Sequence, residues 1–243
     1  MSTLAEFFID RSIRLIARCL AAGKLQTVAS DIENLPSHGP ALIVARHYHH
    51  LYDGLTFFAG VRRRCHFVVA LDWVQNRRAK FFMRTLNRLA RWPILLRADA
   101  VPSAITAGLF SGGEIARYRR RALLEAVELL IEGKIVVVFP EGYPTIDPNG
   151  SRKTDPEQFL PFKSGFLNIL HAAERRLGAR IPIIPAGLRY ESGNFSVSYL
   201  AFGRPIYLDT SNNRQAQVAK IERKVQELSR LTVEEPAKVC SEK

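Results

Sequence analysis

Short apolar runs alternate along this chain with longer stretches of helical periodicity. The runs of strand character lie at 25–29, 41–45, 66–71, 93–97, 135–139, 181–188 and 196–202, and the helical patterns lie at 4–20, 53–62, 79–91, 116–132, 165–176 and 214–231. This alternation predicts a mostly parallel central sheet flanked by helices. A chain of 243 residues is long enough to bury one core of this kind, so we expect a single α/β domain.

Three histidines and one carboxylate follow the second of these runs. His47, His49, His50 and Asp53 come directly after Ala41–Ala45, which reads as a buried strand. An imidazole titrates near neutral pH, so beside an aspartate it can take a proton from an alcohol while the carboxylate fixes its tautomer. The cluster is a candidate general base with an orienting acid.

A second loop rich in functional groups follows the run Ile135–Phe139. It reads Pro140-Glu141-Gly142-Tyr143-Pro144, a turn in which the glycine frees the backbone for close approach. In open α/β sheets, ligands collect beyond the carboxyl ends of the strands. We therefore expect this loop and the histidine cluster to face the same site.

The formal net charge of +12 indicates anionic partners, such as lipid headgroups, phosphorylated cofactors or nucleic acid. Between Arg62 and Arg97 there are ten Lys or Arg residues and one acid, Asp72. Apolar and basic residues interleave there as in a helix that lies in a membrane interface, although a helix docked on the core gives the same pattern. No nucleic-acid-binding motif is recognisable, so we expect no nucleic-acid partner.

The first 24 residues read as a basic amphipathic helix, which either anchors the protein at a membrane or packs on the domain. The remaining divisions are a domain at 25–231 and a flexible tail at 232–243. No apolar run reaches the roughly 18 residues that cross a bilayer, and no export signal is evident. Cys19, Cys65 and Cys240 have no paired spacing, which argues against a thiolate metal site.

Seven segments, in order along the chain, resemble the motifs of the glycerolipid acyltransferase superfamily. This is the family of the 1-acylglycerol-3-phosphate O-acyltransferases. The segments are Ile32–Pro36, Val44–Asp53, Trp92–Arg97, Phe139–Gly142 (Phe-Pro-Glu-Gly), Pro161–Gly165, Ile181–Pro185 and Phe202–Ile206. The resemblance covers most of the chain and is consistent with the predicted α/β fold.

The resemblance implies transfer of a fatty acyl group from an acyl-CoA or acyl carrier protein thioester to a hydroxyl of a lysophospholipid or glycerol phosphate. The thioester is a co-substrate, and neither a metal nor another cofactor is implied. The histidine would be the base and Asp53 its partner, Glu141 and Gly142 would help bind the acceptor, and Arg97 with Lys163 would hold a phosphate. The implied location is peripheral, at the anionic cytoplasmic face of a membrane.

Two departures from the family pattern leave alternatives open. Five residues separate His47 from Asp53, one more than in the family, so either His47 or His49 is the base. After Gly142 the chain has Tyr143-Pro144 where many members have Thr-Arg or Ser-Arg, which leaves the acceptor open. A degenerate lipid-binding protein of the same fold is an alternative, and His47-x-His49 with Asp53 also resembles the ligand set of a metal-dependent hydrolase.

Overall fold

The computed structural model describes residues 3–21, 25–71, 74, 76–97, 112–147, 151–155, 157–191, 197–209 and 213–230. The helices are α1 (Thr3–Ala21), α2 (Tyr52–Gly60), α3 (Arg77–Ala90), α5 (Gly112–Ile131), α6 (Gly165–Leu177) and α7 (Arg214–Arg230), with a 3-10 turn at Ile32–Asn34. The strands are β1 (Gln26–Ser30), β2 (Ala41–Ala45), β3 (Cys65–Phe67), β4 (Val69–Ala70), β5 (Ile94–Leu95), β6 (Ile135–Val138), β7 (Ile183–Tyr190) and β8 (Val197–Phe202). The tail at 232–243, with Cys240, lies outside the described residues.

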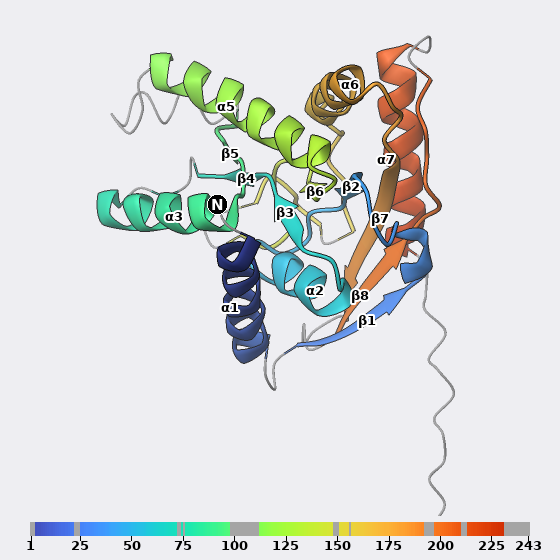
Figure 1. Ribbon diagram of the computed structural model, residues 1–243. Coiled ribbons are helices and arrows are strands. Elements are labelled where there is room, and N and C mark those ends of the chain that lie inside the picture. Colours follow the sequence, from blue (N-terminus) through green and yellow to red (C-terminus); the bar gives the residue numbers. More distant parts are fainter. Residues whose placement is uncertain are drawn as a thin grey trace, which may run out of the picture.

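The main sheet has the strand order β1-β8-β7-β2-β6-β3 (Figure 1). Its neighbours are parallel except for the antiparallel pair β7 and β8. Strands β4 and β5 form a separate parallel pair. The predicted single α/β domain with a mostly parallel sheet is therefore confirmed.

The run predicted as one strand at 66–71 is divided between the two sheets. The backbone N–H of Val68 still donates to Val137 of the main sheet, whereas that of Val69 donates to Pro93 beside the small one. The chain thus changes partner here, from β6 for β3 to β5 for β4. Composition could not reveal the change, since every residue of the run after His66 is apolar.

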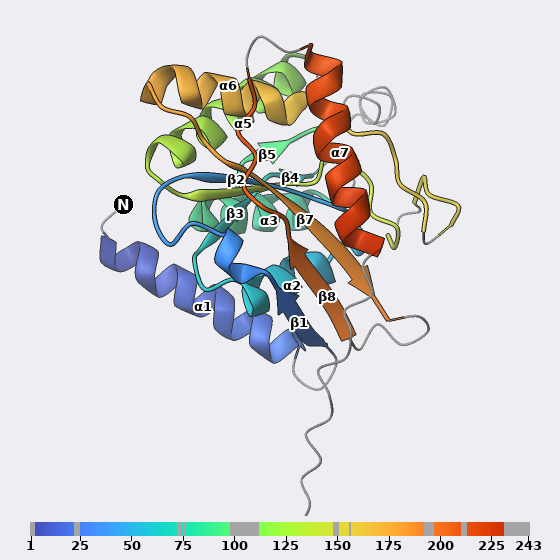
Figure 2. The same ribbon diagram turned by 90° about the vertical axis from the view of Figure 1, so that its right-hand side faces the viewer.

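Strand β2 shows why the centre of the sheet is buried on both sides. Successive side chains of a strand point to opposite faces. Leu42 and Val44 join a core cluster with residues of α5, α6 and α7, while Ile43 and Ala45 join a second cluster with Phe57 of α2. Helices thus cover both faces, with α7 packed across β7 (Figure 2).

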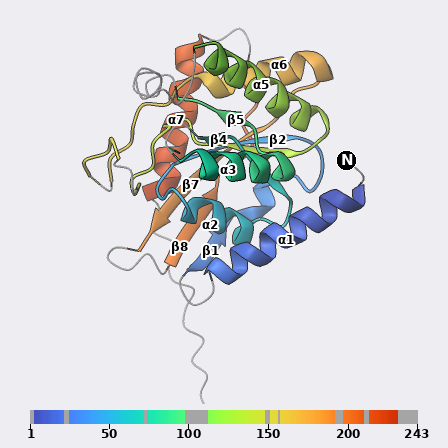
Figure 3. The same ribbon diagram turned by 90° about the vertical axis from the view of Figure 1, so that its left-hand side faces the viewer.

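Helices α1 and α3 lie together at one side of the molecule, outside α2 (Figures 1 and 3). Arg14 joins α1 to the end of α2, since its guanidinium donates to the carbonyls of Phe58, Val61 and Arg62. Both helices expose large apolar side chains: Phe8, Leu15, Ile16, Phe81, Phe82, Leu86 and Leu89. Within the described residues, no helix is long and apolar enough to cross a membrane.

Candidate active site

The register of the sheet brings the two predicted loops together. Val44 of β2 is paired with Val138 of β6, and His47 and Glu141 each stand three residues beyond this pair. Because the strands are parallel, both loops leave the same edge. The backbone N–H of His47 donates to Glu141 Oε1 at 2.9 Å.

Asp53 lies in the first turn of α2, where a negative charge is favoured by the helix dipole. The residue is buried, and each carboxylate oxygen accepts two hydrogen bonds. Oδ2 faces His47 Nδ1 at 2.7 Å and Tyr48 N at 2.8 Å, while Oδ1 faces His49 N at 2.9 Å and the Tyr190 hydroxyl at 2.7 Å. Four donors therefore fix this carboxylate against the His47 imidazole.

The two candidate bases occupy different environments. His47 stacks on Phe139 and places Nδ1 on Asp53, which leaves Nε2 as the nitrogen that can accept a proton. His49 uses Nδ1 to accept the backbone N–H groups of Leu51 and Tyr52 at 3.2 Å each, at the start of α2. Burial lowers the pKa of His49 to about 4, so its ring is neutral at physiological pH.

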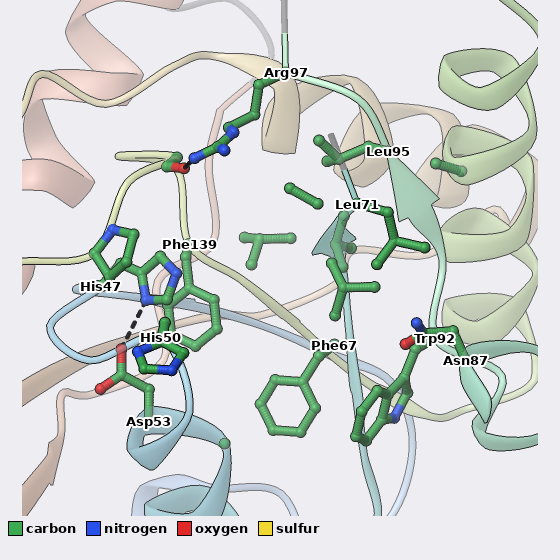
Figure 4. Close-up of a pocket in the computed structure, with 18 of the residues that line it drawn as sticks. His47, His50, Asp53, Phe67, Leu71, Asn87, Trp92, Leu95, Arg97 and Phe139 are labelled. Atoms are coloured by element: carbon green, nitrogen blue, oxygen red, sulfur yellow. Dashed lines mark hydrogen bonds and ion pairs between the residues drawn. The ribbon is translucent and has the colours of Figure 1, made fainter. Parts of the chain in front are cut away.

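A large apolar cavity of about 960 Å³ begins at the His47–Asp53 pair. Figure 4 shows His47, His50 and Asp53 at one side and Phe67, Trp92 and other apolar side chains across from them. The lining also includes residues of α1 and α3, among them Ile16, Met83 and Leu86. A cavity of this size with a few polar groups at one end is typical of a small-molecule site.

Arg97, Gly142 and Lys163 meet at the polar end of the cavity. Arg97 Nη1 donates to the Gly142 carbonyl at 3.0 Å (Figure 4). Gly142 has φ +78°, a conformation that favours glycine, and a Cβ at this position would stand 3.3 Å from Lys163 Nζ. Tyr143 is buried beneath the cations, with the guanidinium carbons of Arg97 and Arg152 at 4.0 and 4.5 Å from its ring centre.

Glu141 is only 1% exposed, and its carboxylate meets donors of the protein itself. Besides His47 N, it accepts the backbone N–H of Leu160 at 3.0 Å and the ammonium of Lys153 at 2.6 Å. The structure thus places Glu141 beside the His47 backbone, and this predicted acceptor-binding residue does not line the cavity.

Tyr190, Arg152 and Lys153 belong to the site and were not found from the sequence. Tyr190 ends a buried strand and reads as an ordinary core residue, and burial beside Asp53 raises its pKa well above the usual value. Arg152 and Lys153 lie in an irregular segment that has no periodicity. Their positions depend on long-range contacts that no local pattern encodes.

Among the described residues there is no group of three or more His, Cys, Asp or Glu side chains that could hold a metal ion. What the site offers is a His–Asp pair, an apolar cavity and a cluster of cations, all at the carboxyl ends of parallel strands. This combination defines a class of protein that can deprotonate a hydroxyl group beside a bound apolar chain.

Comparisons with known proteins identify the family of the chain and a similar fold. The sequence pattern of the Acyltransferase family matches residues 26–189, and the chain belongs to that family. Its fold is similar to that of the 1-acyl-sn-glycerophosphate (LPA) acyltransferase PlsC from Thermotoga maritima, with a TM-score of 0.55 at 18% identity over 93% of this chain and 82% of that one. No curated protein matches the sequence.

Proposed function

We propose that this protein transfers a fatty acyl group from an acyl-CoA or acyl carrier protein thioester to a hydroxyl of a lysophospholipid or a glycerol phosphate. The observation that carries the proposal is the 2.7 Å contact between His47 Nδ1 and Asp53 Oδ2 at the wall of an apolar cavity. The pair supplies a base, and the cavity can hold the acyl chain beside it.

In this reaction His47 Nε2 takes the proton of the acceptor hydroxyl as its oxygen attacks the thioester carbonyl. Asp53 holds the Nδ1 proton and stabilises the imidazolium that forms. The tetrahedral intermediate expels the thiolate, which takes the proton back from His47. The new ester bond replaces the thioester bond, and the base returns to its starting state.

Arg97 and Lys163 are the residues that we propose hold the acceptor phosphate, with Gly142 shaping the approach. The family Arg that would follow Gly142 is absent, but the guanidinium group of Arg152 lies over the same Tyr143 ring as that of Arg97, 4.5 Å from its centre. Guanidinium groups bind phosphate oxygens through paired hydrogen bonds. A phosphate-bearing acceptor therefore remains compatible with the Tyr143-Pro144 departure.

We also propose that the protein works as a peripheral protein on an anionic, cytoplasmic membrane face. Phe81 is 75% exposed and Phe82 61%, and exposed cations such as Arg84 and Arg88 share their helix. Ile16 and Leu86 are exposed and also line the cavity, so a lipid chain could pass between α1 and α3 from the membrane.

The test is a transfer assay with labelled acyl-CoA or acyl carrier protein and a panel of lysolipids and glycerol phosphate. We expect His47→Ala to abolish acyl transfer. His49→Ala should lower the stability of the protein, because the start of α2 loses its hydrogen-bond acceptor, but the folded variant should still catalyse transfer. Full activity in EDTA is expected, because the scheme uses no metal. Absence of transfer by the wild type with every pair of substrates, or an unaffected His47→Ala variant, refutes the proposal.

A further inference from the structure

The backbone of His47 is held on both sides by one buried ion pair. Its N–H donates to Glu141 Oε1 at 2.9 Å, and its C=O accepts from Lys153 Nζ at 2.7 Å. The two side chains also contact each other, with Lys153 Nζ 2.6 Å from Glu141 Oε2, and both are fully buried. The ion pair therefore closes a ring of hydrogen bonds around the peptide groups of His47.

All three hydrogens of the Lys153 ammonium have an acceptor: Glu141 Oε2, the His47 carbonyl and the Thr145 hydroxyl at 3.3 Å. Burial lowers the pKa of Lys153, and the Glu141 carboxylate opposes that shift. Neither Glu141 nor Lys153 lines the cavity. The described hydrogen bonds of the pair all go to groups of the protein itself.

The backbone of His47 forms hydrogen bonds with side chains, whereas the backbones of its two neighbours form hydrogen bonds with other backbone groups. Arg46 N donates to the Ala186 carbonyl, and the Tyr48 carbonyl accepts from Ile146 N, so both neighbours have backbone partners. His47 lies beyond the end of β2, where the ladder stops. A buried ion pair is a poor source of net stability, because both charges must be desolvated, but its geometry is well defined.

We propose that Glu141 and Lys153 are positioning residues that hold the His47 backbone so that its imidazole meets Asp53 and faces the cavity. This inference rests on the proposed function, since its consequence is a change in the rate of acyl transfer. Displacing a catalytic group by about 1 Å can lower a rate by about 10²-fold. Loss of the pair should therefore lower kcat and leave both KM values nearly unchanged.

The variants are Glu141→Gln, Lys153→Met and the two combined. Each single variant changes one charge of a buried pair and can impair folding, whereas the double variant removes both charges and leaves neither uncompensated. The control is Glu174→Gln. Glu174 is also a buried carboxylate that accepts a backbone N–H, from Ile181 at 3.0 Å, and it does not line the cavity.

We would measure kcat, the KM for donor and acceptor, and amide hydrogen exchange at His47 by NMR. Support is a fall in kcat of about 10- to 100-fold with both KM values within about threefold, together with faster exchange at His47. Glu174→Gln should change none of these in the folded protein. The value of kcat distinguishes a positioning role from a merely structural one. Loss of a merely structural residue would lower the stability of the protein and leave the kcat of the folded protein unchanged.

Wild-type kcat in the folded double variant overturns the inference. So does an increase in acceptor KM at unchanged kcat, because it would place Glu141 in contact with the acceptor. Hydrogen exchange needs no turnover: unchanged exchange at His47 in all three variants overturns the inference even if acyl transfer fails. A wild type without acyl transfer refutes the proposed function instead, so the two failures are distinguishable.

Discussion

Replacing Asp53 by Asn tests the candidate dyad most directly, because the carboxylate accepts four hydrogen bonds and an amide can accept only at its oxygen. If the amide NH2 takes the place of Oδ2, it faces His47 Nδ1 and the backbone N–H of Tyr48. If it takes the place of Oδ1, it faces the Tyr190 hydroxyl and the backbone N–H of His49. Either orientation leaves one buried backbone donor without an acceptor.

The cost of one unsatisfied buried N–H is about 1–3 kcal/mol, so we expect Asp53→Asn to lower the free energy of unfolding by about 2 kcal/mol. The rate falls further than stability. An NH2 group on His47 forces Nδ1 to accept and puts the proton on Nε2, the wrong tautomer for a base, and in the serine protease triad this substitution costs about 10⁴ in kcat. In the opposite orientation the amide oxygen faces His47 Nδ1, so His47 keeps the tautomer that a base needs and the pair loses only the negative charge of Asp53.

Tyr190 allows these orientations to be separated. Its hydroxyl can reverse and accept from an NH2 group at the Oδ1 position, which stabilises the orientation that keeps the tautomer. We therefore expect Asp53→Asn with Tyr190→Phe to be slower than Asp53→Asn alone. The assays are kcat at saturating donor and acceptor, and urea unfolding, with the exposed Asp31→Asn as a control that changes neither. Full kcat in folded Asp53→Asn would refute the role of the dyad.

Three further predictions concern other parts of the molecule. Gly142→Ala should lower activity, because it strains a residue at φ +78° and brings a methyl group to 3.3 Å from Lys163 Nζ; an unchanged acceptor KM and kcat would contradict the shaping role of this turn. Burial lowers the pKa of His66 to about 4 from an ordinary 6.5, so the unfolded chain binds the extra proton between these values. The folded state is therefore fully stable with respect to this group above pH 6.5, and its free energy of unfolding falls by about 3 kcal/mol in total as the pH falls toward 4. His66→Asn should make the free energy of unfolding less dependent on pH between these values. An equal slope in the variant and the wild type would count against this prediction. Phe81→Ser and Phe82→Ser should each weaken binding to anionic vesicles by about tenfold or more, while the exposed Tyr207→Ser does not; equal binding by all three variants would disprove the membrane face.

The sequence was sufficient to predict the central strands, because burial on both faces demands a continuous apolar run. The run Ala41–Ala45 is β2 without adjustment. The sequence was insufficient for residues 66–71, because apolar residues do not specify the strand with which they pair. The change of partner strand after Val68 depends on where the other strands lie.

The same distinction applies to the candidate site. The resemblance predicts Arg97, Glu141, Gly142 and Lys163 as substrate-binding residues. Arg97, Gly142 and Lys163 meet at the polar end of the cavity, whereas the Glu141 carboxylate accepts from the His47 backbone and does not line the cavity. Lys153 lies 106 positions from His47, and Tyr190 lies 137 positions from Asp53. Contacts at such separations depend on the fold of the whole domain, so no local pattern predicts them.

The extra residue between His47 and Asp53 is accommodated by a turn in which side chains replace backbone acceptors. Asp53 accepts the N–H groups of Tyr48 and His49, and the His49 ring accepts those of Leu51 and Tyr52. This use of His49 conflicts with service as the base, because a proton on Nδ1 would face two N–H donors, and burial already lowers the pKa of His49 to about 4. The histidine that satisfies the helix start thereby leaves His47 as the imidazole that meets the carboxylate.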